Sequence, residues 1–187
     1  MRYLPYPESV RLFRPARPAR ALWNVIKTLV GLILIWFVFL FLVPLGISIV
    51  EVDLGIQRFP PQYLAAAGLL LVSTILALWS AMTVAIAGQG TPLPFDSART
   101  IVAAGPYAYL RYPLALASTG QLVALGITLG SVPVLLYGAI AFVLWYYLVR
   151  PAAEHDQAAR FGSAWRAYAG AVRGFRPRLI PYRPTRS

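Results

Sequence analysis

The sequence predicts an all-α, polytopic membrane protein with about four transmembrane helices and a cytoplasmic C-terminal amphipathic helix. Three observations predict it: the 187 residues are 59% hydrophobic, the apolar residues come in blocks too long for a small soluble core, and arginines gather at both ends. A helix needs about 20 apolar residues to cross a bilayer. Residues 25–50 exceed that length, so they form the first predicted span.

Two further apolar runs complete the predicted fold. Residues 63–87 form a second span, bounded by two prolines before it and Gly-Gln-Gly after it. Residues 114–149 are too many for one crossing, and Gly-Ser-Val-Pro at 130–133 interrupts them near the midpoint. Such a cluster marks a turn, so the run predicts a helical hairpin. Its many glycines and alanines favour close helix packing, the alternative being a groove left open for a lipid-like substrate.

The placement of charge predicts the topology. The net charge is +11, with arginines concentrated in residues 2–20 and 150–186, whereas residues 51–62 carry two acidic residues and one arginine. Basic residues favour the cytoplasmic side of a membrane, so we expect both termini in the cytoplasm. The basic ends also suit anionic lipid headgroups, and membrane lipids, not nucleic acid, are the expected partners.

The chain divides into three expected parts. Residues 1–24 form a basic N-terminal segment, residues 25–87 the first two transmembrane helices, and residues 88–187 the half that carries the candidate site. A cleavable signal peptide has a short apolar core near its start, whereas here a basic segment precedes a full-length span. We therefore expect the N-terminal segment to remain in the mature protein, on the cytoplasmic side.

Two residue counts exclude whole classes of chemistry. The chain has no cysteine, which excludes disulfides, thiolate nucleophiles and thiolate metal ligands. It has a single histidine, His155, which is expected at the surface, and one histidine does not make a metal site. No metal site is predicted.

Arg111 is the first candidate functional residue. It lies in the stretch Gly-Pro-Tyr-Ala-Tyr-Leu-Arg-Tyr-Pro at 105–113, directly before a long apolar run. An arginine at a bilayer boundary is costly unless it has an anionic partner, and Pro106 and Pro113 restrict the backbone that presents it. Residues 88–112 form a polar connection rich in glycine and proline, which is available to bind a ligand.

Glu154 is the second candidate, because it follows the hairpin on the same side of the membrane. Residues 151–169 suit an amphipathic helix on which Glu154 shares a face with apolar residues. The other members of this face are Ala158, Phe161, Trp165 and Tyr168. A carboxylate on a buried face needs a partner or a shifted pKa, whereas Asp156 points elsewhere and is expected to be solvated.

These elements resemble the membrane-embedded methyltransferases related to isoprenylcysteine carboxyl methyltransferase and the phospholipid methyltransferases. The stretches that carry the resemblance are Gly90-Thr91-Pro92-Leu93-Pro94, residues 102–113 with Gly-Pro-Tyr and Arg-x-Pro, Glu154, Phe161-Gly162, Tyr168 and residues 172–177. They occur in order over about half of the chain. The resemblance implies a few membrane helices and methyl transfer from S-adenosylmethionine to a lipophilic small-molecule or prenylated acceptor. It suits an integral protein of a bacterial inner membrane.

The resemblance also implies roles for individual residues. Arg111 and Glu154 are the expected catalytic residues, Arg111 as a clamp for the carboxylate of S-adenosylmethionine and Glu154 as an acceptor for its ammonium or ribose hydroxyls. Tyr107, Tyr109 or Trp165 would cover the adenine or face the sulfonium. The full set of expected cofactor-binding residues is Gly105, Pro106, Tyr107, Tyr109, Arg111, Pro113, Glu154 and Trp165.

Three departures from the family pattern keep other functions open. The chain has Tyr112, Ala115 and Ala153 where the family usually has Asn or His, Tyr and Glu. One alternative is a membrane scaffold that keeps the fold without catalysis. Another is an NADPH-dependent enzyme related to the steroid reductases, which also end near an Ile-Pro pair like the one at 180–181. The acceptor stays open between a prenylated carboxylate, a phospholipid amine and another apolar molecule.

Overall fold

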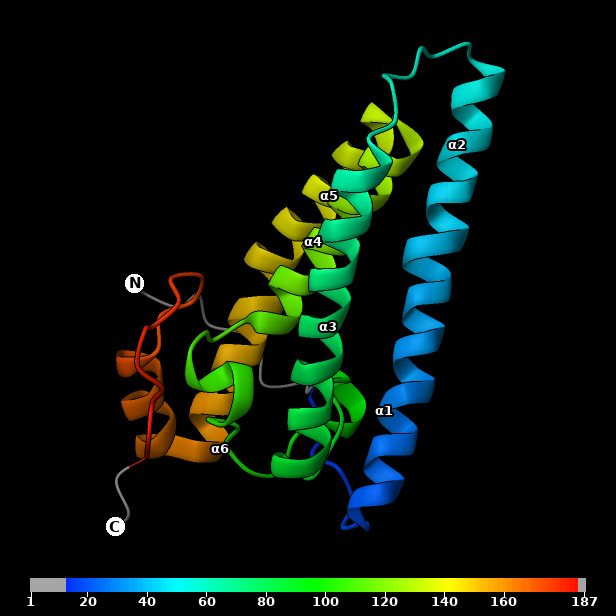
Figure 1. Cartoon of the computed structure of the whole chain (residues 1–187). Helices are drawn as coiled ribbons and strands as arrows, with labels where there is room; N and C mark the ends of the chain where they lie inside the picture. The colour runs from blue at the N-terminus through cyan, green and yellow to red at the C-terminus, as the bar shows by residue number, and fades with distance from the viewer. Residues whose placement is uncertain (1–12, 185–187) are drawn as a thin grey trace.

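The computed structural model describes residues 13–184, and every regular element in that range is helical (Figure 1). Three of its helices are long and apolar enough to cross a membrane: Ala21–Asp53, Tyr63–Ala87 and Val132–Ala171. A shorter apolar helix, Pro113–Leu129, lies between the last two in the chain. The predicted all-α membrane fold is thus confirmed, and the protein is an integral membrane protein.

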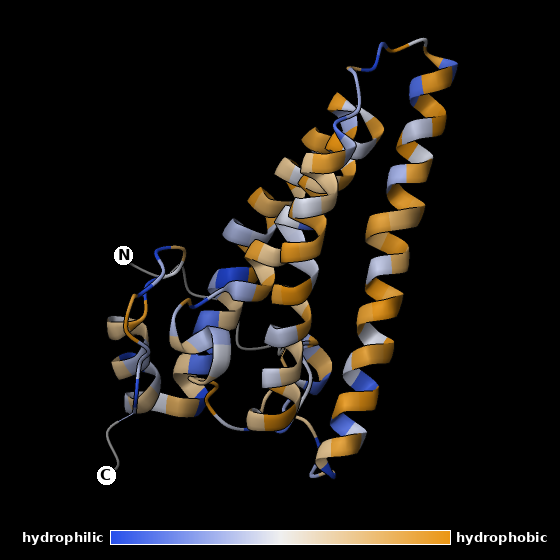
Figure 2. Ribbon diagram, in the orientation of Figure 1, coloured by the Kyte–Doolittle hydropathy of each residue, from blue (hydrophilic) through white to orange (hydrophobic). Residues whose placement is uncertain are grey.

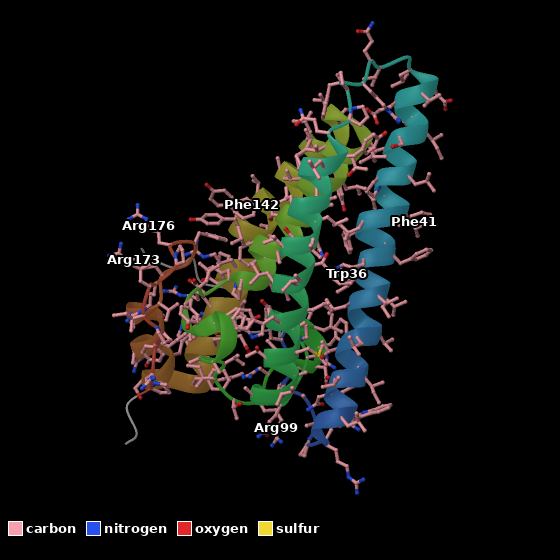
Figure 3. All side chains as sticks on the ribbon, in the orientation of Figure 1. Trp36, Phe41, Arg99, Phe142, Arg173 and Arg176 are labelled. Atoms are coloured by element: carbon pink, nitrogen blue, oxygen red, sulfur yellow. The ribbon has the colours of Figure 1, made fainter. Side chains whose placement is uncertain are left out.

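The first membrane helix is longer than residues 25–50, the predicted span. It comprises α1 (Ala21–Trp36), the π-helical segment η1 (Phe37–Leu42) and α2 (Val43–Asp53). Its 33 residues extend about 50 Å at 1.5 Å per residue, more than the ~30 Å of hydrocarbon. Most of its large apolar side chains are exposed, as expected for a helix that faces lipid, and orange dominates it in Figure 2. Phe41 points away from the other helices in Figure 3.

Two prolines lie inside long helices without ending them, and in both cases a π turn precedes the proline. Pro44 follows η1, where Val43 N donates to Val38 O, and Pro151 follows η4 (Trp145–Val149), where Arg150 N donates to Trp145 O. A proline has no N–H and its ring clashes with the preceding turn. The wide turn shifts the hydrogen-bond register just before the proline, so the helix continues past it.

The helix α3 (Tyr63–Ala87) packs closely against α4 (Pro113–Leu129). A Cβ at Gly120 would lie 2.2 Å from Ser73 Oγ and 3.2 Å from Ser73 Cβ, so a larger residue here would require Ser73 to shift. At the far end, Gly130 adopts a left-handed conformation (φ 63°) and Ser131 caps α5 (Val132–Leu144). The predicted hairpin therefore forms, and its small residues bring the helices together.

The turn of this hairpin is tied to the first membrane helix through Glu51. Glu51 Oε2 accepts from Ser131 Oγ at 2.8 Å and pairs with Arg58 Nη2 at 3.3 Å. The Glu51 side chain is 1% exposed. A buried carboxylate needs such partners, so this cluster fixes the end of α2 against the start of α5.

The C-terminal amphipathic helix differs from the prediction of a separate, regular element. Helix α6 (Arg150–Ala171) continues directly from α5 through η4, and it bends at Gly162, where φ is 53° and ψ is −119°. This conformation is open to glycine and costly for other residues. Figure 1 shows the second part of α6 turning back beside the first. The prediction of a single helical face from Glu154 to Tyr168 is therefore wrong in geometry, although Glu154, Trp165 and Tyr168 are all buried.

Candidate functional site

A cavity of about 400 Å³ lies where the polar connection, the hairpin and α6 meet. One wall comes from residues 91–102, which include the short helix η2 (Pro94–Asp96), from Arg111, and from the first part of α6. The charged residues of this wall are Arg111, Asp156 and Arg160. Its apolar wall comes from the start of α4 and from α5 and η4. The residues of the apolar wall are Leu114, Ala115, Ser118, Leu122, Ala141, Phe142, Trp145 and Val149. The cavity therefore joins a charged end to an end built by membrane helices.

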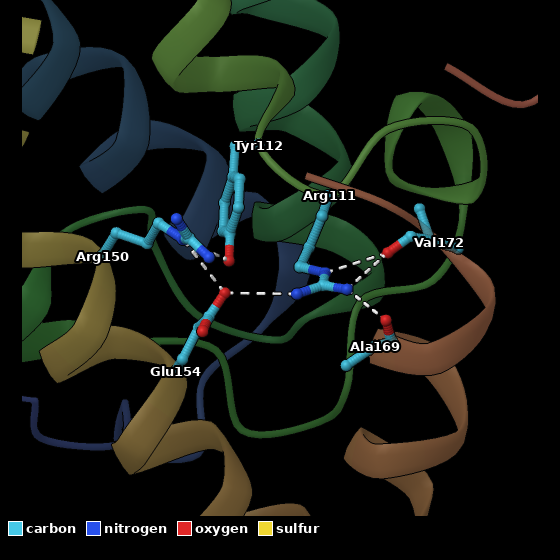
Figure 4. A network of polar contacts seen from close by, with 6 residues as sticks. All are labelled: Arg111, Tyr112, Arg150, Glu154, Ala169 and Val172. Carbon is cyan, nitrogen blue, oxygen red and sulfur yellow. Dashed lines mark hydrogen bonds and ion pairs between the residues drawn. The ribbon is translucent and has the colours of Figure 1, made fainter. Parts of the chain in front are cut away.

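Arg111 reaches from the start of α4 to the end of α6 (Figure 4). Its Nε donates to Val172 O at 3.0 Å, and Nη2 donates to Val172 O at 2.7 Å and also to Ala169 O. Its Nη1 donates to Glu154 Oε1 at 3.2 Å. The carbonyls at a helix C-terminus lack partners within the helix and carry partial negative charge. Arg111 therefore caps α6 and fixes its second part.

The contacts of Arg111 change its expected role. A guanidinium has five N–H groups, and four of those of Arg111 are directed at protein acceptors. A bidentate clamp on a ligand carboxylate needs two N–H groups on one edge. Arg111 lines the cavity and contributes positive charge to it. In this conformation most of the N–H groups of Arg111 donate to acceptors within the protein.

Glu154 is shared between two arginines. Its Oε1 lies 3.2 Å from Arg111 Nη1 and 3.2 Å from Arg150 Nε, and the side chain is only 5% exposed. Arg150 also donates to Tyr112 Oη at 3.3 Å. Glu154 is not among the described residues that line the cavity. The two residues were expected on the same side of the hairpin, and the structure joins them in an ion pair that supports the wall of the cavity.

The turn before α4 is held by main-chain contacts. It contains η3 (Gly105–Ala108), in which Gly105 has φ 54° and a Cβ would lie 2.6 Å from Thr83 Oγ1. Pro106 is buried, Tyr109 O accepts from Arg178 N at 2.9 Å, and Pro113 begins α4. None of Gly105, Pro106, Tyr109 and Pro113 is among the described lining residues. They shape the backbone that carries Tyr107 and Arg111.

Tyr107 and Trp165 do line the cavity. Trp165 packs in a buried cluster with Tyr168 and Val172, and the Arg111 guanidinium lies 5.8 Å from its ring centroid. Tyr168 Oη donates to Tyr107 O at 2.8 Å. Burial raises the pKa of the Tyr107 hydroxyl above its usual range, and burial raises the pKa of Tyr168 as well. Both are therefore neutral hydroxyls at ordinary pH.

The cavity has charged lining residues that the sequence analysis missed. Asp156, expected to be solvated, borders the cavity together with Gln157 and Arg160. Arg160 Nη1 lies 3.2 Å from Asp156 Oδ2. The spacing of four residues was a visible signal for this pair. The predicted apolar face of α6 excluded Asp156, and the loop that contacts Arg160 through Ser97 and Ala98 encloses this other side of the helix.

The N-terminal segment also reaches the cavity. Arg14 N donates to Pro94 O at 2.8 Å, Ala16 N donates to Ser97 O at 2.9 Å, and Ser97 N donates to Arg14 O at 2.8 Å. These bonds place Phe13 among the lining residues. The segment was expected to contribute charge and topology, and its described part also closes one side of the cavity. Arginine and proline content gave no signal for this contact.

Aromatic side chains form a further wall beside Arg150. Tyr112 lies 5.3 Å from Trp145 and 5.6 Å from Phe175, measured between ring centroids, and Phe142 lies 5.5 Å from Phe175. The Arg150 guanidinium lies 5.5 Å from the Tyr112 centroid. Within residues 13–184, no group of three or more His, Asp or Glu is placed to hold a metal ion. The site is therefore built from arginines, carboxylates and aromatic rings.

Comparison with known families gives a match to part of the chain that carries the cavity. A family model described as phospholipid methyltransferase matches residues 61–160, from the segment before α3 to the Arg160 that borders the cavity. The match covers more than half of the chain and includes Arg111, Glu154 and Asp156. No curated protein matches the chain.

Proposed function

Because the chain belongs to the phospholipid methyltransferase family, we propose that it transfers a methyl group from S-adenosylmethionine to an acceptor that partitions into the membrane. The observation that carries this proposal is the cavity, which has charged groups at one end and membrane-helix side chains at the other. A reaction between a water-soluble donor and a lipophilic acceptor needs such a boundary. The family supports methyl transfer as the reaction.

The residues present fit S-adenosylmethionine. The cavity has a volume of about 400 Å³, which lies within the ~300–1,000 Å³ common for small-molecule sites. A ligand of the size of S-adenosylmethionine can therefore enter it. Aromatic surface for an adenine or a sulfonium comes from Trp165, Tyr107 and Phe161. Arg111, Arg160 and Asp156 offer charges of both signs for the amino-acid end. When bound, this donor supplies a methyl group on an already activated sulfonium, and the leaving thioether is neutral.

Positioning is then the main contribution of the protein. We propose that Arg111 and Glu154 support catalysis by holding the second part of α6, and with it Trp165, against the start of α4. Arg111 additionally supplies positive charge inside the cavity. The backbone that presents Tyr107 and Arg111 is fixed by Gly105, Pro106, Tyr109 and Pro113. Tyr107 and Trp165 are the proposed direct contacts of the donor.

The acceptor site is proposed at the apolar wall. Ala115, Ser118 and Ala141 are small, and they leave room beside Phe142 and Leu122. An apolar chain in this space would be removed from water, which is favourable by about 25 cal/mol per Å². Ala115 replaces the tyrosine that the family usually has, so the chain has more space here. A lipid-like or prenylated acceptor fits this wall.

Methyl transfer can be tested with purified protein and membranes from the cells that express it. The protein is incubated with S-adenosylmethionine labelled in its methyl group, and label is measured in the organic extract and in the protein fraction. We expect transfer of label that depends on the protein and that falls at least tenfold in Arg111→Ala. Absence of transfer, together with thermal stabilisation by NADPH but not by S-adenosylhomocysteine, would favour the reductase alternative. Stabilisation by neither would favour the scaffold.

A further inference from the structure

Asp156 is the acidic residue among the described residues that line the cavity. Its side chain is 22% exposed, whereas Glu154, two residues earlier on the same helix, is 5% exposed and faces Arg111 and Arg150. The lining residues also include two arginines, Arg111 and Arg160. Without the Asp156 carboxylate, the cavity wall would carry two positive charges and no negative one. A cationic ligand group would then be repelled.

Arg160, one turn further along α6, holds Asp156 in place and is itself anchored by contacts outside the helix. Its Nη1 donates to Asp156 Oδ2 at 3.2 Å and to Ser97 Oγ at 2.7 Å, and its Nη2 donates to Ala98 O. Its guanidinium lies 4.9 Å from the Phe161 centroid. An exposed ion pair four residues apart is weak and mobile. This pair is anchored to a loop more than 60 residues away in the sequence, which makes it a preorganised feature of the cavity.

We propose that the Asp156–Arg160 pair recognises a zwitterionic group of the ligand, with Asp156 receiving the ammonium and Arg160 the neighbouring acidic group. This inference rests on the proposed function. A carboxylate offers about four lone-pair positions, so its bond to Arg160 is compatible with a bound ammonium. Three N–H groups of Arg160 are directed at protein acceptors, against four of Arg111. Arg160 is therefore better placed than Arg111 to bind a ligand anion.

Two sources supply such a group: the amino-acid end of the methyl donor and a zwitterionic lipid headgroup. The experiment separates them by equilibrium titration of the full-length protein in detergent. The first probe is S-adenosylhomocysteine, compared with its deaminated analogue, which keeps the carboxylate and lacks the ammonium. The second is dihexanoylphosphatidylethanolamine, compared with dihexanoylphosphatidylglycerol, which lacks the ammonium. Each is titrated into the wild type and into Asp156→Asn.

If Asp156 receives the donor's ammonium, Asp156→Asn lowers the affinity for S-adenosylhomocysteine about 10- to 100-fold. The same substitution changes the affinity for the deaminated analogue by no more than about twofold, because this analogue has no ammonium for Asp156 to bind. If the headgroup is the source, the same pattern appears in the lipid pair instead. An equal change for both members of each pair, or no change in any, overturns the proposal.

Control variants separate charge and folding from recognition. Asp53→Asn removes one negative charge from an exposed residue at the end of α2 and should leave every affinity unchanged. Retained binding of the deaminated analogue shows that the Asp156→Asn cavity is intact. If that variant does not fold, Asp156→Glu moves the carboxylate by one methylene, and it should weaken binding of the ammonium-bearing member of a pair more than binding of the member that lacks the ammonium. Failure of the wild type to bind either nucleoside contradicts the proposed function, while the lipid pair still decides the role of Asp156.

Discussion

Arg111 and Val172 are joined by two hydrogen bonds to one carbonyl oxygen, from Nε at 3.0 Å and from Nη2 at 2.7 Å. The residues are 61 positions apart in the chain. The contact connects the start of α4 with the end of α6, and so it connects the membrane hairpin with the helix that carries Trp165 and Tyr168. The Arg111 side chain is 14% exposed, so little water competes for these bonds.

This contact predicts that Arg111→Lys is not a conservative change. Lysine keeps the charge beside Glu154 but lacks the planar fork that reaches two carbonyls at once. We expect a loss of about 1.5–3 kcal/mol in the free energy of unfolding, seen as a lower Tm in detergent, and weaker binding of S-adenosylhomocysteine. Arg99→Ala, an exposed arginine in the same polar connection, is the control. Equal, small effects of both substitutions would show that the Arg111 contacts contribute little.

Gly162 predicts a second, purely conformational effect. Its φ of 53° is strained for any other residue, while a Cβ there would meet no atom within 4 Å. Gly162→Ala should therefore lower stability by about 1–3 kcal/mol through backbone strain alone and misplace Trp165. Gly170→Ala is the matched control, because Gly170 lies within α6 and a Cβ there also meets nothing within 4 Å. It should be neutral or slightly stabilising. A Gly162→Ala variant as stable as Gly170→Ala would contradict the bend.

The buried tyrosines predict a loss of stability at alkaline pH. Burial raises the pKa of Tyr168, with Tyr107 adding to the effect and the Arg111 charge opposing it, and burial raises the pKa of Tyr107. In the unfolded chain these hydroxyls ionise near pH 10, where the folded protein still holds their protons. Stability is therefore complete below pH 10 and falls as the pH rises above it.

The variant Tyr168→Phe isolates this effect. It should lower Tm at about pH 9, because the hydrogen bond from Tyr168 Oη to Tyr107 O is lost. Such a bond contributes about 1 kcal/mol to stability. Its further loss of Tm between about pH 9 and pH 11 should be smaller than that of the wild type, because one ionising hydroxyl is gone. Thermal unfolding in the same detergent at both pH values measures the difference. Parallel losses in both proteins would contradict a raised pKa at Tyr168.

The arginine distribution predicts that both ends of the chain face the cytoplasm. Because the chain has no cysteine, single introduced cysteines report sidedness cleanly. Gln57→Cys lies in the exposed connection between α2 and α3, and Ser163→Cys lies on the exposed side of α6. We expect a membrane-impermeant maleimide to label position 57 in cells with an intact inner membrane, and position 163 only after that membrane is permeabilised. The reverse pattern would overturn the topology.

The sequence predicted the features that depend on the distribution of side chains. Long apolar runs predicted the spans, and the turn at Gly130 predicted the hairpin. Arg111 and Glu154 were expected on the same side of the hairpin, but their ion pair at 3.2 Å was not predicted. Features that depend on the main chain could not be predicted. The acceptors at Ala169 and Val172 are carbonyls, which any residue provides, and the loop that encloses Asp156 at the cavity contacts Arg160 partly through the carbonyl of Ala98.

Binding of S-adenosylmethionine in the cavity can be measured by calorimetric titration of the purified wild type in detergent. We expect saturable binding at one site per chain, competition by S-adenosylhomocysteine, and an affinity about 10- to 100-fold lower in Arg111→Ala. Arg99→Ala should bind like the wild type. If correctly folded protein binds neither nucleoside, the cavity is not a site for S-adenosylmethionine.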